Sequence, residues 1–308
     1  MPIQTQPQLF VIGALHVDEI ATADTPFILG ESNPVSWIQR VGGVAANAAR
    51  AASAAAPDTN ITLLANCGND ANAQNLRSAM LETGVDVLTP YTNRCNAGRY
   101  CAVIQPNGDV LIGLADVSQA EAISAEAITE HLHKLRVDAI LLDGNLSATT
   151  IKEFAAAPQT KTALMAVCVS PAKSDRFVES LAFLDVLFCN RQEAAALTAK
   201  IENAADGSVE PKLESLCSQG CAHIVMTDGA NGVHIQSGRD HSHLTANAIE
   251  NPHTLNGPGD ALAGATAANL LTADITHQRL TEAVLTRGMP AAGAVLAGDN
   301  VAPLINTN

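Results

Sequence analysis

The chain has few aromatic and few basic residues. Aromatics make up 3% of its 308 residues, and 17 Lys and Arg stand against 31 Asp and Glu, which gives a formal charge of −14. Because a nucleic-acid surface needs clustered Lys and Arg to neutralise phosphates, this balance argues against nucleic acid as a partner. A small polyphosphate ligand remains compatible with it, since backbone N–H groups and a bound Mg²⁺ offset phosphate charge.

Long apolar runs and paired cysteines are also missing. No run approaches the roughly 20 residues of a membrane span, and the polar start Met1–Gln8 does not resemble a signal peptide. The seven cysteines are an odd number, and Cys217 and Cys221 have no second pair to complete a zinc site. We therefore expect buried free thiols, no membrane partner and a cytoplasmic location. The pairs His131/His133 and His241/His243 are expected at the surface.

Short apolar runs alternate with helical segments along most of the chain. Strands are predicted at 9–14, 61–65, 139–143, 163–167, 186–189, 223–227 and 232–235, and helices at 43–56, 71–82, 147–156, 174–182, 193–197 and 260–271. Such runs are typical of strands buried on both faces of a parallel sheet. The repeated β-α order predicts an α/β fold with helices on both faces of the sheet, and a loop up to Gly257.

The stretch 99–115 departs from this order. Two apolar runs, 100–104 and 110–114, flank Gln105-Pro106-Asn107-Gly108-Asp109, and Asn-Gly inside a short polar loop favours a β-hairpin. We expect this hairpin to join residues near 14–40 in a small sheet that projects from the main body. Small projecting sheets often close over a binding site, so a lid is the functional interpretation.

The segment Asn256-Gly257-Pro258-Gly259-Asp260 carries the strongest chemical signal. Its glycines precede an alanine-rich helix, and a helix N-terminus presents free N–H groups and partial positive charge to a phosphate. Asp260 falls in the first turn, where a carboxylate can take a proton from an alcohol bound beside that phosphate. An ordinary Asp cap on a glycine turn gives the same pattern, so this segment alone leaves both interpretations open.

Two further strand–helix junctions repeat the glycine pattern. Gly42-Gly43 opens the helix that contains Asn47, and Thr227-Asp228-Gly229-Ala230-Asn231-Gly232 follows a strand. Each by itself is compatible with a simple turn. The presence of all three, in this order, favours a site that brings a polar ligand and a nucleotide together. A Rossmann dehydrogenase is disfavoured, because no GxGxxG follows the first strand.

With Asn190-Arg191-Gln192-Glu193 between them, these segments resemble the motifs of the ribokinase-like (PfkB-type) carbohydrate kinases over nearly the whole chain. The first glycine pair with Asn47 matches one signature, and 257–260 matches the second, usually written GAGD. Residues 190–193 match the NxxE motif and 227–232 match TxGxxG. The resemblance implies an ATP-dependent kinase and a three-layer α/β/α fold with a central, mostly parallel sheet. It also implies a single domain over 1–308, with a β lid from roughly 14–40 and 95–116.

The resemblance also implies a role for each matching residue. Asp260 matches the position of the family's catalytic base. The neighbouring Gly257, Pro258 and Gly259 match its anion hole. The residues expected to bind the substrate are Asp18, Gly42, Gly43 and Asn47. Those expected at the nucleotide are Asn190, Thr227, Gly229 and Gly232, with Glu193 holding Mg²⁺ through water.

Three positions depart from the family pattern. Pro258 replaces the usual alanine and removes one N–H from the anion hole. Thr254 stands where the family often has an Asp associated with a monovalent cation, which puts K⁺ activation in doubt. His16 replaces the commoner Asn two residues before Asp18 and indicates a changed substrate site.

The middle of the chain is similar to one branch of the family, the pseudouridine kinases. The resemblance lies in 98–103, 115–117, Asp143-Gly144-Asn145-Leu146 and 169–173. It implies pseudouridine as the acceptor. Arg99 and Asn145 are candidate contacts for it, but solvent exposure or a structural turn is the favoured role for each. The alternatives are a kinase of a free sugar or another nucleoside (ribose, adenosine or a ketohexose) and a non-catalytic nucleotide-binding sensor. Trp37 is expected to pack in the lid or in a homodimer contact through it.

Overall fold

The computed structural model describes residues 6–90, 95–157, 162–204, 210–246, 257–272 and 282–297. Nine strands of this part of the chain form a large sheet, and they are β1 (Gln8–Ile12), β4 (Asn60–Leu64), β5 (Val85–Leu88), β8 (Ala139–Asp143), β9 (Ala163–Val167), β10 (Val186–Asn190), β11 (His223–Thr227), β12 (Val233–Ser237) and β13 (Asp240–Leu244). Their order is β13-β12-β11-β10-β9-β8-β1-β4-β5. All neighbouring pairs from β11 to β5 are parallel, which confirms the predicted parallel sheet.

The antiparallel strands β12 and β13 close one edge of this sheet. The prediction of a loop was wrong at Asp240–Leu244, which pairs with β12 through a tight turn. The sequence Asp-His-Ser-His-Leu has no apolar run, because this edge strand is held by ladder hydrogen bonds and is not buried in the core. Periodicity of apolar residues therefore cannot detect it.

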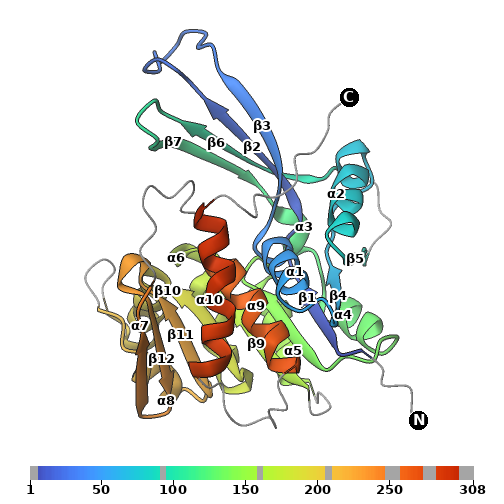
Figure 1. Ribbon diagram of the computed structural model, residues 1–308, viewed down its shortest axis with the longest axis vertical. Coiled ribbons are helices and arrows are strands. Elements are labelled where there is room, and N and C mark those ends of the chain that lie inside the picture. The colour runs from blue at the N-terminus through green and yellow to red at the C-terminus, as the bar shows by residue number, and fades with distance from the viewer. Residues whose placement is uncertain are drawn as a thin grey trace.

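Helices cover both faces of the large sheet and make three layers (Figure 1). One face carries α1 (Val44–Ala55), α2 (Ala71–Glu82), α9 (Pro258–Thr272) and α10 (Glu282–Ala297). The other carries α4 (Ala125–Leu132), α5 (Ala148–Ala156), the 3₁₀ helix η1 (Asp175–Phe183), α7 (Arg191–Glu202) and α8 (Leu213–Ser218). Leu9 and Val11 of β1 point into the first core, and Phe10 and Ile12 point into the second. This alternation explains why the strand sequences are apolar throughout.

Some helices differ from the predicted ones. The helix expected at 174–182 is a short α6 (Pro171–Ser174) followed by η1, and the helix expected at 193–197 extends over the whole of α7. The sequence reasoning did not identify α3 (Ser118–Glu121), α4, α8 or α10. Over the described residues no helix is long and apolar enough to cross a membrane.

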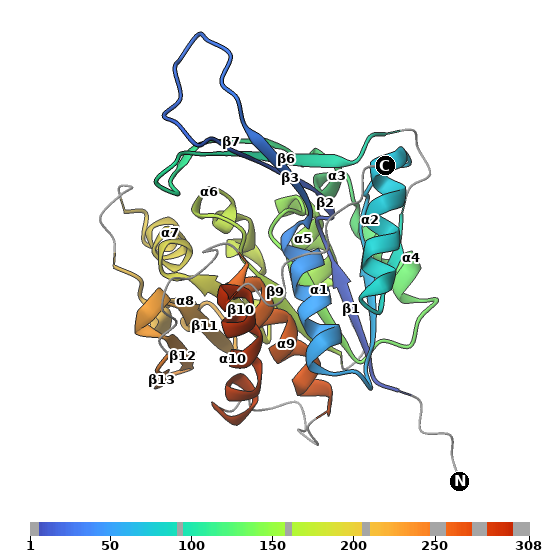
Figure 2. The same ribbon diagram turned by 45° about the horizontal axis from the view of Figure 1, so that its top comes forward.

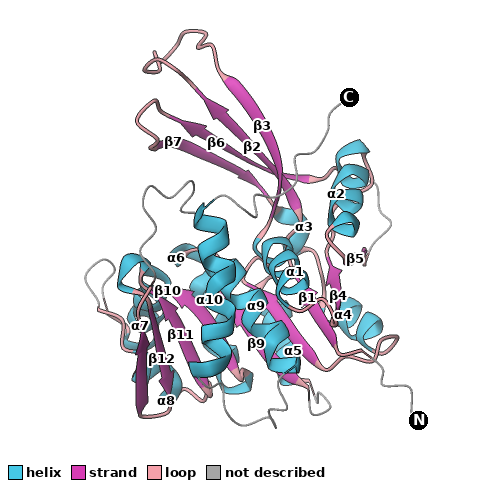
Figure 3. Ribbon diagram, viewed as in Figure 1, coloured by secondary structure: helices cyan, strands magenta, loops and turns pink. Residues whose placement is uncertain are grey.

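The small sheet has the order β3-β2-β6-β7 and projects from one end of the large sheet (Figures 1 and 3). Its strands are β2 (His16–Thr22), β3 (Ser36–Gly42), β6 (Gly98–Ile104) and β7 (Val110–Asp116). The hairpin β6–β7 and its pairing with residues near 14–40 were predicted correctly. In Figure 2 the small sheet lies across the top of the large one, above the ends of α1 and α6.

All seven cysteines are free, and five of them are buried, whereas Cys95 and Cys101 are only partly buried. Burial raises the pKa of Cys168 and Cys189, which leaves these thiols protonated and unreactive.

In a thiol titration with Ellman's reagent we expect at most two rapid equivalents in the native protein and seven in denaturant. Rapid reaction of three or more thiols in the native protein would contradict this burial.

Candidate active site

The sequence motifs meet where the carboxyl ends of the parallel strands face the N-termini of α1 and α9. In open α/β sheets ligands bind at this edge. Asn47, in the first turns of α1, donates a hydrogen bond from Nδ2 to Oδ2 of Asp260 in α9 at 3.0 Å. These residues are 213 positions apart in the chain. The fold therefore joins the first glycine motif to the last.

Close packing of α1 against α9 fixes this pair. A Cβ atom on Gly264 would lie 1.9 Å from the carbonyl oxygen of Ala48, so only glycine allows the two helices to approach this closely. The facing residues Ala45, Ala49 and Ala263 are fully buried. The small side chains of both helices thus set the distance between Asn47 and Asp260.

Asp260 has an unusual electrostatic environment. Burial raises its pKa to about 7, and the negative charges of Asp143, Glu193 and Asp18 act in the same direction. The hydrogen bond from Asn47 acts in the opposite direction, because it stabilises the carboxylate. A carboxyl group with a pKa near neutral pH is suited to general base catalysis.

Two glycines shape the backbone next to Asp260 and Asn47. Gly43 has φ of 109°, and a Cβ there would meet the Ala14 carbonyl oxygen at 2.2 Å. Gly257, with φ of 94°, precedes α9, and a Cβ on Gly259 would have no neighbouring atom within 4 Å. The N-terminus of α9 therefore offers backbone amides next to open space, although Pro258 contributes no N–H.

Asp18 lies at the base of the small sheet. Its Oδ1 is 3.1 Å from Nε2 of His16, and a Cβ on Gly42 would lie 2.1 Å from the same oxygen. Among the described residues, no hydrogen-bond partner is found for the buried Nδ1 atom of the partly buried His16. Asp18 thus lies against Gly42 of the first glycine motif, with His16 beside its carboxylate.

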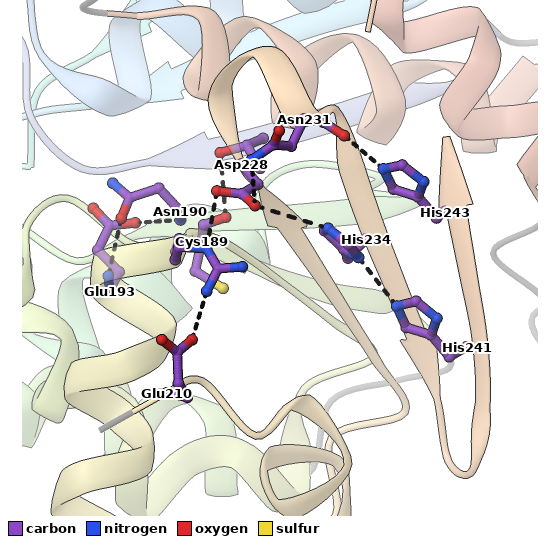
Figure 4. Close-up of polar contacts among 11 residues, drawn as sticks. Cys189, Asn190, Glu193, Glu210, Asp228, Asn231, His234, His241 and His243 are labelled. Atoms are coloured by element: carbon purple, nitrogen blue, oxygen red, sulfur yellow. Dashed lines mark hydrogen bonds and ion pairs between the residues drawn. The ribbon is translucent and has the colours of Figure 1, made fainter. Parts of the chain in front are cut away.

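Asn190 and Glu193 form a capping box at the start of α7 (Figure 4). The Asn190 side chain accepts from the Glu193 N–H at 2.9 Å, and the Glu193 carboxylate accepts from the Asn190 N–H at 2.8 Å. This local role explains the residue pair by itself. Glu193 is nevertheless 4% exposed, and burial raises its pKa, so it adds a desolvated carboxyl group to the neighbourhood of Asp260.

The segment 227–232 forms the turn between β11 and β12. Thr227 donates to the Cys189 carbonyl at 3.5 Å, which places the turn beside the end of β10. Gly229 and Gly232 have φ of 55° and 94°, values that favour glycine. Asp228 is paired with Arg191 at 3.0 Å, so this turn is linked to the start of α7.

Three histidines lie together beside this turn, on the β12–β13 hairpin (Figure 4). Nδ1 of His234 is 3.1 Å from Nε2 of His241, and the His234 and His243 rings are stacked at 4.6 Å. Burial lowers the pKa of His234. Within the described ranges, no group of three or more His, Cys, Asp or Glu side chains could hold a metal ion.

The sequence reasoning did not assign a role to Asp143. This residue ends β8, is completely buried, and accepts hydrogen bonds from the backbone N–H groups of Ala14 and Ala45. Asn145, a candidate contact in the sequence, is 3% exposed and donates to the same carboxylate at 3.3 Å. The signal in the sequence was a lone carboxylate directly after a buried apolar strand. Thr254, where the monovalent cation was considered, lies outside the described residues.

Comparisons with known proteins agree with this arrangement. Residues 6–306 match the pfkB family carbohydrate kinases, and the chain belongs to this family. It is 25% identical to the pseudouridine kinase of Escherichia coli (strain K12) over 262 residues, which are 82% of this chain and 80% of that protein.

Solved structures confirm the ribokinase-like fold. A ribokinase from Thermotoga maritima has a TM-score of 0.77 at 19% identity and covers 97% of each chain. A ribokinase from Cryptococcus neoformans var. grubii serotype A, in complex with ADP, has a TM-score of 0.72 at 19% identity, over 95% of this chain and 94% of that one. The protein is therefore an ATP-dependent kinase of the ribokinase-like class that acts on a sugar or nucleoside.

Proposed function

We propose that this kinase transfers the γ-phosphoryl group of ATP to the primary hydroxyl of a nucleoside, with pseudouridine as the acceptor and pseudouridine 5′-phosphate as the product. The observation that carries the proposal is the Asn47–Asp260 pair at the N-terminus of α9, next to Gly257 and Gly259. This arrangement brings a base, a polar substrate contact and a phosphate-binding helix end to one place.

In the proposed reaction Asp260 takes the proton of the acceptor hydroxyl while the hydroxyl oxygen forms a bond to the γ-phosphorus. The bond from this phosphorus to the bridging oxygen breaks, and ADP leaves with the electron pair. Backbone amides at Gly257 and Gly259 stabilise the charge on the transferred group, because phosphoryl transfer depends mainly on positioning and charge stabilisation. Asp18, Gly42, Gly43 and Asn47 hold the acceptor.

The nucleotide is proposed to lie along the turn 227–232 and the start of α7. Support comes from the open backbone at Gly229, where a Cβ would meet no atom within 4 Å, and from the ADP complex of the structurally similar ribokinase. Thr227, Gly232 and Asn190 border the same region. Mg²⁺ commonly binds through one or two carboxylates, waters and substrate phosphates, and Glu193 fits such a role through water. When bound, Mg²⁺ neutralises phosphate charge.

The choice of pseudouridine depends on the curated relative and on the similar segments of the middle chain. The alternative acceptors are ribose, adenosine and a ketohexose. A coupled assay for ADP release with pseudouridine, uridine, adenosine, ribose and fructose separates them. We expect pseudouridine to give the highest kcat/KM, and a tenfold preference for uridine or a free sugar would overturn the choice.

The pH dependence of the reaction follows from Asp260. Because its pKa is raised to about 7, the carboxylate needed as a base forms only as the pH rises through this value. We expect kcat/KM for the acceptor to increase between pH 6 and 8 and to level off above. A profile that is flat from pH 5.5 to 8.5, with chemistry shown to be rate-limiting, would contradict this role.

Pro258 offers a test of the anion hole. Replacing it with alanine adds one backbone N–H at the start of α9, where a single donor contributes on the order of 10²-fold to kcat in other oxyanion sites. We expect Pro258→Ala to raise kcat with little change in the KM for ATP. A matched substitution at Pro290, inside α10, is the control for general effects of removing a proline.

The small sheet is proposed to act as a lid and as a homodimer contact. One row across it contains Trp37, Ala21, Val103 and Ile112, and Leu114 lies two residues further along β7 on the same face. Trp37, Ile112 and Leu114 are 58%, 48% and 55% exposed. A second copy of this apolar face would cover them. Light scattering should show a dimer. Ile112→Glu should dissociate it, whereas Leu81→Glu, at an exposed position of α2, should leave it intact.

The free thiols support a reducing compartment, and we infer a cytoplasmic location from them. The site needs no disulfide to hold it, because its residues come from the ends of packed helices and strands. Fractionation of cells that carry the tagged chain, with a protease-protection assay on the fractions, tests this inference.

A further inference from the structure

Asp143 is a completely buried carboxylate to which the sequence analysis assigned no role. Its Oδ2 accepts from the N–H groups of Ala14 and Ala45, both at 3.0 Å, and from Nδ2 of Asn145 at 3.3 Å. Its Oδ1 accepts from the Asn145 N–H at 2.8 Å. Burial raises the pKa of Asp143, and the hydrogen bonds from Ala14, Asn145 and Ala45 act in the opposite direction. Each of these partners is a donor, so the contacts suit an ionised carboxylate; a protonated one would have no acceptor among them.

These hydrogen bonds connect three separate segments. Ala14 lies between β1 and β2, Ala45 is in the first turn of α1, and Asp143 ends β8. Gly13 is required beside them, because a Cβ there would lie 2.2 Å from Cγ of Asp143. The Asp143 carboxylate thus fixes two stretches of backbone: the one immediately before Asn47, and the one that leads into β2, the strand that contains Asp18.

The charge of Asp143 also reaches Asp260. Asp143, Asp18 and Glu193 all act to raise the pKa of Asp260, while Asn47 opposes them. Lys173, on α6, is the cation on the other side of Asp143, and it donates to Oδ1 of Asn145 at 2.8 Å. The groups that face Asp143 and Asp260 therefore come from four elements: β2 (Asp18), α1 (Asn47), α6 (Lys173) and α7 (Glu193).

We propose that Asp143 is a positioning residue. It holds the start of α1 against β1 so that Asn47 and Asp260 meet the acceptor, and its buried charge acts on the base Asp260. It acts through these residues and does not touch the substrate. The inference rests on the proposed role of Asp260.

The test compares Asp143→Asn with Asp138→Asn. Asp138 lies just before the first residue of β8, at the opposite end of the strand from Asp143. It accepts a hydrogen bond from the Gln8 N–H of β1 at 2.9 Å, so it is a matched structural carboxylate away from the site.

We expect Asp143→Asn to lower kcat/KM for the acceptor by about 10- to 100-fold, because small displacements of reacting groups cost this much. The rising limb of its pH profile should move to lower pH, since a negative neighbour of Asp260 has been removed. Asp138→Asn should leave both unchanged.

An unmoved pH limb in Asp143→Asn, or equal effects of the two substitutions, would overturn the proposal. A second measurement needs no turnover. In the wild-type protein, carboxyl ¹³C resonances, assigned with Asp260→Asn, should show Asp260 titrating near pH 7 and Asp143 already ionised there. Asp143 found protonated at pH 7 would also overturn the proposal. Failure of the proposed function would appear instead as full turnover of Asp260→Asn.

Discussion

Asp260→Asn is expected to lower kcat by about 10²- to 10⁴-fold, the usual contribution of a general base. The substitution keeps the size of the side chain and its contact with Asn47, and it removes only the ability to take a proton. The affinity for ADP, measured by calorimetry, should stay within about twofold. Residual turnover should lose the pH dependence of the wild-type enzyme.

The same variant should be more stable than the wild type above pH 7. The pKa of Asp260 is raised in the folded protein to about 7, so the folded state holds a proton that the unfolded state has lost. Stability therefore falls as the pH rises from about 4 through 7, and a neutral Asn avoids this loss. Asp240→Asn, on exposed β13, is the control and should change neither activity nor Tm. Turnover of Asp260→Asn equal to the wild type would remove the proposed base.

Gly264→Ala is expected to destabilise the protein by about 1–3 kcal/mol, the usual cost of overpacking. The new methyl group would lie 1.9 Å from a backbone atom, the Ala48 carbonyl oxygen, so α9 must move away from α1. Such a movement separates Asp260 from Asn47, and a displacement of 1 Å can cost on the order of 10²-fold in rate. We expect a lower Tm and a lower kcat/KM together.

Gly288→Ala in α10 is the matched helical control. There the contact of a new Cβ under 3.0 Å is with a side-chain oxygen, Oγ1 of Thr266, at 2.4 Å, and the nearest backbone atom, the Thr266 nitrogen, is at 3.2 Å, so the overlap with backbone is smaller than at Gly264. Alanine also favours a helix by up to about 1 kcal/mol over glycine. A smaller fall in Tm and nearly unchanged kcat/KM are therefore expected. If Gly264→Ala behaves as this control does, the contact between α1 and α9 does not set the geometry of the site.

Particular residues show how far sequence reasoning reached. Gly43 and Gly257 have φ of 109° and 94°, values that favour glycine, and the glycine-rich segments around them predicted the two helix N-termini that meet at the site. The pair Asn190 and Glu193 was interpreted as a nucleotide and metal contact, and the structure gives it a local capping role as well. Sequence spacing cannot separate the two, because a capping box and this motif need the same residue types at the same distance.

The amino-acid sequence by itself determined the α/β class, the two glycine-rich helix starts and the β6–β7 hairpin, because each depends on local residue patterns. The candidate base came from the resemblance of several motifs taken together. Only the tertiary structure decided that Asp143 serves the start of α1, that β13 closes the sheet, and that burial and three carboxylates shift the pKa of Asp260. These features depend on contacts between residues far apart in the chain, and both desolvation and charge interactions are fixed by distances that only folding sets.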